Sequence, residues 1–259
     1  MALAVDIPGE RLVKSDERVR DLGEVFTPSA TVAAILDMLP GEMWAVHPAP
    51  TFLEPSCGDG NFLVAVLERK LAQVAHGHAA GSLPAGTSSE SAQFHGLEAL
   101  ASIYGVDISS DNVIGGTPGH EIGARTRLLN QFVEWNRTVL SKRLSERSPV
   151  LRAAEWILNH NILVANMLPA DAEGKSTGRD LLPIVEYLFE PSGHTVTLQK
   201  TTLGDVIAEQ ESVTSRELLL FGPAAPVQFW AGKALNMSSA DRLEAPRLSG
   251  PARNGRERA

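Results

Sequence analysis

The chain has 259 residues, of which 43% are hydrophobic, and it carries a formal net charge of −8 at pH 7. This length allows one large α/β domain with an appendage, and the negative charge argues against broad binding of nucleic acid phosphates by this chain alone. No run of apolar residues is long enough to indicate a membrane span, and no signal peptide is expected. The single cysteine, Cys57, cannot form an internal disulfide, which favours a reducing, cytoplasmic location.

The first part of the chain predicts two helices. Residues 1–22 are polar, and we expect a loosely attached helix or extension there. In the stretch GEVFTPSATVAAILDMLP, Thr27 is suited to cap a second helix and Pro28 to occupy its first turn. Apolar residues then recur on one helical face until Pro40 and Gly41 end the helix.

The stretch TFLEPSCGDGNFLVAVLERKL, residues 51–71, predicts a buried strand, a tight glycine turn and an amphipathic helix. A loop is expected at 76–91, because the residues there are small and polar. A short helix around 94–102 then leads into IYGVDI, a second buried strand that ends in Asp107.

The following segments repeat the alternation of helix and strand. We expect helices at 122–143 and 150–159, followed by a third strand, NILVAN, at 161–166. This spacing predicts a parallel sheet with right-handed crossovers. The stretches PIVEYLF and TVTLQK flank the turn-like EPSGH and predict a hairpin. The predicted fold class is therefore α/β: a mostly parallel sheet with helices on both faces and an antiparallel finish.

The predicted domain covers residues 23–235, and a tail follows at 236–259. The tail ends in PRLSGPARNGRERA, whose content of Pro, Gly and Arg predicts disorder. A segment that contacts phosphates is the alternative reading of this tail, because four of its residues are Arg.

A strand, a glycine turn and a helix in this order usually hold a nucleotide or a nucleoside cofactor. A phosphate-binding loop requires Gly-Lys-Ser/Thr at its end, whereas Gly60 is followed by Asn61 and Phe62. A dinucleotide fingerprint requires a third glycine where this chain has Leu63, which weakens the reading as an NAD site. S-adenosylmethionine and a fold without a cofactor are the other two readings.

S-adenosylmethionine suits the polar residues of this region. It has no pyrophosphate, and its ribose diol needs an acceptor at the end of the next strand. Asp107 is placed to accept both hydroxyls, because an ionised carboxylate only accepts hydrogen bonds. Glu54 or Asp59 could approach the ammonium group. The sequence therefore favours S-adenosylmethionine over NAD.

Three stretches, LGEVFTP, FLEPSCGDGNFL and IYGVDI, together closely resemble the adenine-specific DNA methyltransferases of restriction–modification systems, in particular the methylation-subunit type. The resemblance covers residues 20–168. It implies a Rossmann-like class I methyltransferase fold with S-adenosylmethionine as the cofactor. It also implies double-stranded DNA with an adenine target as the substrate.

The resemblance also implies a role for individual residues around the cofactor. These residues are Phe26, Thr27, Pro28, Glu54, Pro55, Ser56, Gly58, Gly60, Asp107, Ile108 and Asn166. Residues 26–28 would close over the cofactor, and the residues from 54 to 60 would wrap its methionine part. Asp107 would bind the ribose, and Ile108 would lie against the adenine. Asn166 stands where the family usually has an Asp that bonds the adenine amine, and its carbonyl oxygen can still accept that hydrogen bond.

The catalytic residues are unknown, because the tetrapeptide of that family, Asn/Asp/Ser-Pro-Pro-aromatic, is absent from the chain. In the family it accepts hydrogen bonds from the adenine amine and stacks on the flipped base. The nearest stretches are FEPSG at 189–193, for which a turn is the first reading, and FGPAAP at 221–226. Three hypotheses follow: an active methyltransferase with a divergent loop, a cofactor-binding subunit that needs a partner chain, and a non-catalytic regulator.

Other residues have structural readings beside functional ones. No cluster of His, Cys or carboxylate residues has metal-ligand spacing, so no metal site is expected. Cys57 is expected to pack in the core, and Trp230 is a candidate for contact with a base or a partner. A basic stretch predicts a solvated face or, alternatively, a stripe that contacts the DNA backbone. Its residues are Arg125, Arg127, Arg137, Lys142, Arg143 and Arg147.

Overall fold

The computed structural model describes residues 15–22, 24–116, 121–168, 178–192, 195–212 and 225–228. Its elements in chain order are α1 (Asp16–Leu22), α2 (Ser29–Leu36), η1 (Gly41–Trp44), β1 (Phe52–Glu54), α3 (Asn61–Ala80), α4 (Ser89–Ala101), β2 (Ile103–Asp107), α5 (Ser110–Val113), α6 (Ala124–Thr138), α7 (Pro149–Asn161), β3 (Ile162–Val164), η2 (Arg179–Leu181), β4 (Pro183–Phe189), β5 (Thr195–Thr202), α8 (Leu203–Ser212) and β6 (Ala225–Gln228). Trp230, the start of FGPAAP, residues 1–14 and the tail at 236–259 lie outside the described residues. None of the described helices is long and apolar enough to cross a bilayer.

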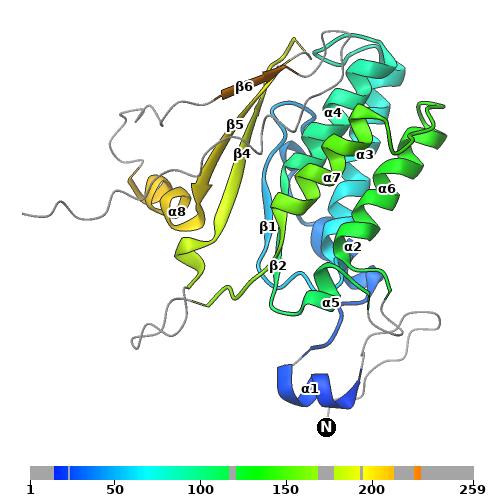
Figure 1. Cartoon of the computed structure of the whole chain (residues 1–259). Helices are drawn as coiled ribbons and strands as arrows, with labels where there is room; N and C mark the ends of the chain where they lie inside the picture. Colours follow the sequence, from blue (N-terminus) through cyan, green and yellow to red (C-terminus); the bar gives the residue numbers. More distant parts are fainter. Residues whose placement is uncertain are drawn as a thin grey trace, which may run out of the picture.

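The strands β1, β2 and β3 form a parallel sheet with β2 in the centre (Figure 1). All five residues of β2 are buried. The register pairs Glu54 with Gly105 and Asp107 with Val164. Because the strands are parallel, their carboxyl ends and the residues that follow them meet at one edge, which is where open α/β sheets bind ligands. The helices α1 and α5 lie at this end of the molecule (Figure 1).

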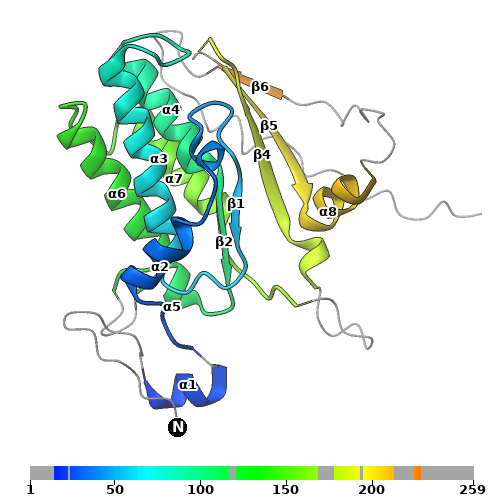
Figure 2. The ribbon, with the colours of Figure 1, turned by 180° about the vertical axis from the view of Figure 1, so that it is seen from behind.

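Four helices, α3, α4, α6 and α7, lie together on one side of the parallel sheet (Figures 1 and 2). Their apolar faces meet the sheet in the main hydrophobic core. The fully buried members of this core include Leu67, Leu100, Phe132, Ile157 and Ile162. Each such side chain contributes about 1.5–3 kcal/mol of hydrophobic stabilisation. The helical spacing of apolar residues in the sequence therefore corresponds to this shared core.

The helix α3 packs closely on β2 at Gly105. A Cβ atom added at Gly105 would lie 2.6 Å from Cδ1 of Leu63 and 3.2 Å from Sγ of Cys57. In dinucleotide-binding folds, the third glycine of the fingerprint on the helix permits this close approach. Here the glycine lies on the strand, and Leu63 of the helix occupies the space beside it.

The opposite side of the parallel sheet is covered by β4 and α8. Tyr104 and Val106 of β2 pack there against Ile184 of β4 and Leu203, the first residue of α8. The Tyr104 hydroxyl donates a hydrogen bond to the carbonyl of Val185 at 2.6 Å. Helices thus lie on both sides of the parallel sheet, and the mixed α/β class is confirmed.

The predicted hairpin is confirmed, but its place in the fold differs from the expected one. The strands β4 and β5 pair antiparallel, and the amide of Glu190 donates to the carbonyl of Thr195 at 2.9 Å across the turn. The third strand of this sheet is β6, and among the described residues no strand of it pairs with β1 or β3. The antiparallel strands therefore form a second sheet instead of finishing the first, because periodicity identifies strands and not their partners.

The loop expected at 76–91 is shorter than predicted, because helices take up both of its ends. The helix α3 continues to Ala80, and α4 begins at Ser89. Gly81 has φ 66° and caps the end of α3, while the Ser88 side chain accepts the amide of Ser91 and caps the start of α4. Residues 76–80 and 89–91 thus belong to helices, and residues 81–88 form the loop between them.

Candidate functional site

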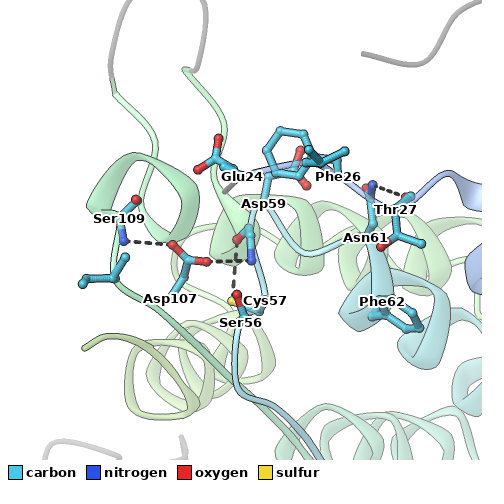
Figure 3. Close-up of a pocket in the computed structure, with 13 residues that line it drawn as sticks. Glu24, Phe26, Thr27, Ser56, Cys57, Asp59, Asn61, Phe62, Asp107 and Ser109 are labelled. Carbon is cyan, nitrogen blue, oxygen red and sulfur yellow. Dashed lines mark hydrogen bonds between the residues drawn. The ribbon is translucent and has the colours of Figure 1, made fainter. Parts of the chain in front are cut away.

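An open recess lies at the carboxyl ends of β1 and β2, beneath the segment 24–27 (Figure 3). Its volume is about 160 Å³ within its walls. Three segments that are far apart in the sequence supply the lining residues: Glu24, Val25, Phe26, Thr27, Ser56, Cys57, Gly58, Asp59, Asn61, Phe62, Asp107, Ile108 and Ser109. The recess therefore brings together the three stretches on which the family resemblance depends.

The floor of the recess is the glycine turn between β1 and α3. The amide of Cys57 donates to the carbonyl of Val106 at 2.9 Å, and the amide of Gly60 donates to the carbonyl of Cys57 at 2.9 Å. Gly58 and Gly60 have φ values of 53° and 94°, in the left-handed region that favours glycine. A Cβ atom at Gly58 would also approach the Phe26 ring to 3.0 Å. The turn therefore needs glycine for its conformation and for its contact with the roof.

Asp107 joins this turn to the end of β2. Its Oδ2 atom accepts the amide of Gly58 at 2.9 Å, and its Oδ1 atom accepts the amide of Ser109 at 2.8 Å (Figure 3). The side-chain amide of Asn112 also donates to Oδ1, at 3.0 Å. Asp107 is 8% exposed. A carboxylate can accept about four hydrogen bonds, so a ligand hydroxyl can still bind at this position.

The roof of the recess is formed by residues before α2. Phe26 is buried, and the carbonyl of Thr27 accepts a hydrogen bond from the Asn61 side chain at 3.1 Å (Figure 3). This bond ties the roof to the first turn of α3. Val25 and Ile108 are 57% and 61% exposed, so they form the apolar mouth of the recess.

Asp59 lines the recess but is held from the side by α6. Its Oδ1 atom lies 2.8 Å from Nη1 of Arg127, and the same nitrogen donates to the carbonyl of Asp59 at 2.9 Å. The side chain of Asp59 is 29% exposed and that of Arg127 is 30% exposed. This ion pair neutralises much of the charge that Asp59 could offer to a ligand ammonium group.

Five residues that the sequence predicted as cofactor contacts are not in the wall of the recess. They are Pro28, Glu54, Pro55, Gly60 and Asn166. Pro28 and Gly60 instead form the N-caps of α2 and α3. Burial raises the pKa of Glu54 above its usual range, because desolvation disfavours its charged form. Asn166 is exposed, and its Oδ1 atom accepts the amide of Leu168 at 3.0 Å.

Sequence reasoning assigned no cofactor contact to six residues of the recess. They are Glu24, Val25, Cys57, Asn61, Phe62 and Ser109. All six lie within two residues of a predicted contact, so proximity in the motifs was their available signal. Burial raises the pKa of the Cys57 thiol well above its usual range, which agrees with the packing role expected for it.

A larger groove of about 890 Å³ lies between β1 and the β4–α8 side of the molecule. Its lining includes Pro55, Leu53, Tyr104 and Leu188, and the EPSG turn contributes Glu190 and Pro191. Glu190 closes the β4–β5 hairpin, and Pro191 and Ser192 form a turn, so the turn reading is confirmed for the described residues 190–192. No described residue of this turn lines the recess, so EPSG does not replace the missing tetrapeptide there.

Most of the basic residues near α6 have partners within the chain. The pairs are Arg125 with the Ile162 carbonyl, Arg127 with Asp59, Arg137 with Glu134, and Lys142 with Glu90. Internal pairing lowers the number of positive charges available to phosphates. The structure therefore favours the solvated and structural reading of this stretch over a stripe that contacts the DNA backbone.

One cluster in the described part of the chain joins two histidines and a carboxylate: His47, His95 and Glu98, with ligand-type atoms within 4.8 Å of one another. Glu98 Oε1 lies 2.8 Å from His47 Nδ1 and accepts the Ala49 amide, and Oε2 lies 3.0 Å from His95 Nδ1. The Ala85 amide donates to His95 Nε2, which places the ring proton on Nδ1, facing Glu98. These mutual hydrogen bonds indicate an anchor for the turn before β1. No sequence pattern pointed to this cluster, because His47 lies 51 residues from Glu98.

No family model, curated protein or solved structure matches this chain. The function therefore has to be inferred from the recess and from the sequence motifs that meet in it.

Proposed function

We propose that this chain binds S-adenosylmethionine in the recess and is a DNA methyltransferase of the Rossmann-like class I type that acts on the exocyclic amine of adenine, as in restriction–modification. One observation carries the proposal: Gly58 and Asp107 are 49 residues apart, yet the Gly58 amide donates to Asp107 Oδ2 at 2.9 Å beneath Phe26. The glycine turn, the strand-end acid and the FTP stretch thus form one site. Their sequence motifs resemble those of the adenine-specific enzymes.

The residues of the recess suit the separate parts of this cofactor. Asp107 would accept a ribose hydroxyl at its remaining acceptor position, and the start of α3 at Asn61 would offer backbone amides and a positive helix end to the carboxylate of the cofactor. Phe26 and Ile108 would contact the adenine. The recess encloses part of the ligand, and the rest would lie across the exposed mouth at Val25. When bound, the cofactor supplies a methyl group activated by a sulfonium.

A second candidate function is a cofactor-binding subunit that requires a partner chain. The described residues bring no proline-aromatic loop to the recess, and Arg127 beside it is paired with Asp59. Phosphate binding therefore has few free cations here, and a partner would supply DNA contacts and the acceptor site. A non-catalytic regulator that keeps the pocket is the third candidate.

Binding of the cofactor is tested by calorimetric titration of the full chain with S-adenosylmethionine. We expect micromolar affinity for the wild type and a loss of about tenfold for Asp107→Asn, because a charge-assisted hydrogen bond contributes about 1.5–3 kcal/mol. Asp37→Ala is the matched control, since Asp37 is 70% exposed and pairs with Arg69 away from the recess. Circular dichroism would check that both variants are folded. Failure of the wild type to bind would refute the proposal.

The reaction is tested with duplex DNA and cofactor labelled in its methyl group. Transfer to adenine by the chain alone supports the active enzyme, whereas transfer only after addition of a neighbouring gene product supports the incomplete subunit. Cofactor binding without transfer in either condition supports the regulator.

A further inference from the structure

A continuous set of polar contacts leads from the recess to α1. It begins at Asp107, passes through Asn112 and Glu24, and ends at Arg18 of α1. Asp111, the neighbour of Asn112 on α5, receives a second contact from Arg18. The short helix α5 therefore holds both the carboxylate of the recess and the N-terminal helix.

Asn112 is the centre of this network and is 1% exposed. Its Nδ2 atom donates to Asp107 Oδ1 at 3.0 Å and to Glu24 Oε2 at 2.9 Å. Both partners are carboxylates, which only accept hydrogen bonds when ionised, so the amide nitrogen must face them. One NH₂ group therefore separates and orients the buried carboxylate of Asp107 and the partly buried carboxylate of Glu24. The other donors to Asp107 are the backbone amides of Gly58 and Ser109.

Arg18 closes the outer end of the network. Its Nε atom donates to Glu24 Oε1 at 2.9 Å, its Nη2 atom binds Glu24 Oε2, and its Nη1 atom donates to Asp111 Oδ2 at 2.9 Å. The side chains are only partly exposed: 24% for Arg18, 11% for Glu24 and 12% for Asp111. A two-pronged contact in this setting is stronger than an ordinary surface ion pair.

We propose that Asn112 is a positioning residue that couples the binding of a ribose diol by Asp107 to the docking of α1. The proposal rests on the proposed binding of S-adenosylmethionine. A ligand that uses Asp107 favours one orientation of its carboxylate, and Asn112 transmits that preference to Glu24 and Arg18. By linkage, docking of α1 then strengthens ligand binding by the same factor by which the ligand strengthens docking.

The diol part of the proposal is tested with Asn112→Ala and three ligands: S-adenosylhomocysteine, adenosine and 2′,3′-dideoxyadenosine. We expect the variant to bind the two diol ligands about fivefold to tenfold more weakly and the dideoxy ligand as the wild type does. A general structural defect would weaken all three ligands equally and would overturn the role of Asn112. Arg137→Ala is the control, because Arg137 pairs with Glu134 on the exposed face of α6.

The coupling part is tested by hydrogen exchange of the α1 amides, Asp16–Leu22. S-adenosylhomocysteine should slow this exchange about threefold or more in the wild type and leave it unchanged in Asn112→Ala. Arg18→Ala should exchange faster without ligand and bind the ligand about threefold more weakly. Equal protection of α1 in all three proteins overturns the coupling. If the wild type binds no ligand, the proposed function fails, whereas normal binding with no change in Asn112→Ala refutes only this inference.

Discussion

Gly105 of β2 offers a direct test of how the glycine turn is positioned. Replacing it with alanine would place a Cβ atom 2.6 Å from Leu63 Cδ1 and 3.2 Å from both Cβ and Sγ of Cys57. Leu63 is 1% exposed and Cys57 is 6% exposed, so neither side chain can move into solvent. The new methyl group would therefore press α3 and the turn away from the sheet.

The expected magnitude follows from two opposing effects. Overpacking a dense core costs about 1–3 kcal/mol, whereas replacing glycine with alanine stabilises by about 0.4–1 kcal/mol through the unfolded chain. We expect Gly105→Ala to lower the free energy of unfolding by about 1–2 kcal/mol. In the double variant Gly105→Ala/Leu63→Ala the clash with Cδ1 is absent. Its loss in free energy of unfolding should therefore be smaller, by about 1 kcal/mol, than the sum of the losses of the two single variants.

Urea denaturation followed by circular dichroism measures these differences. Gly41→Ala is the matched control, because a Cβ atom there meets nothing within 4 Å. The reasoning is refuted if Gly105→Ala is as stable as the wild type, or if the double variant shows fully additive losses. If Gly105→Ala is as fully folded as the wild type under the assay conditions but binds the ligand more weakly, the packing of β2 sets the geometry of the turn.

Three further predictions concern other parts of the fold. Tyr104→Phe should lower the free energy of unfolding by about 1 kcal/mol in urea titrations, because it removes the bond to Val185 that joins the two sheets; an unchanged midpoint would contradict this. Glu98→Gln should lower the free energy of unfolding by about 2–4 kcal/mol, because the new amide would face donors from His47, Ala49 and His95. A thermal midpoint equal to that of the wild type would argue that this cluster does not anchor the turn before β1. Burial lowers the pKa of Lys70 from its ordinary 10.5 to about 8. The unfolded chain therefore holds this proton when the folded chain has lost it, so the free energy of unfolding should rise between pH 8 and 10.5 relative to Lys70→Met; parallel pH profiles of the two proteins would show that Lys70 keeps its charge.

The helices and strands of the first half followed from local patterns. Apolar spacing identified α2 and α3, and the buried run IYGVDI identified β2, because each pattern matches the period of its own element. The end of α3 was misplaced, since Ala, Gly and His in this stretch look like loop residues. Their helical state depends on packing of the inner face, as at Val74 and Gly77, which are buried.

For the recess too, local motifs predicted some residues correctly and misplaced others. The sequence pointed to Phe26, Gly58 and Asp107 through motifs with a known chemical purpose, and all three line the recess. It also pointed to Asn166, which is exposed and bonded to its own loop. A position after a strand predicts nearness to the edge of a sheet, but not the direction in which the side chain points.

Local periodicity and backbone sterics were enough to predict the alternation of elements, the need for glycine in the turn and the acid at the end of β2. The pairing of the strands was set by the tertiary structure, in which β4 and β5 belong to a second sheet. The tertiary structure alone also decided that Arg127 holds Asp59 and that Asn112 lies between Asp107 and Glu24. These contacts join residues 5 to 88 positions apart. Their partners are set by the packing of whole elements, which no local pattern records.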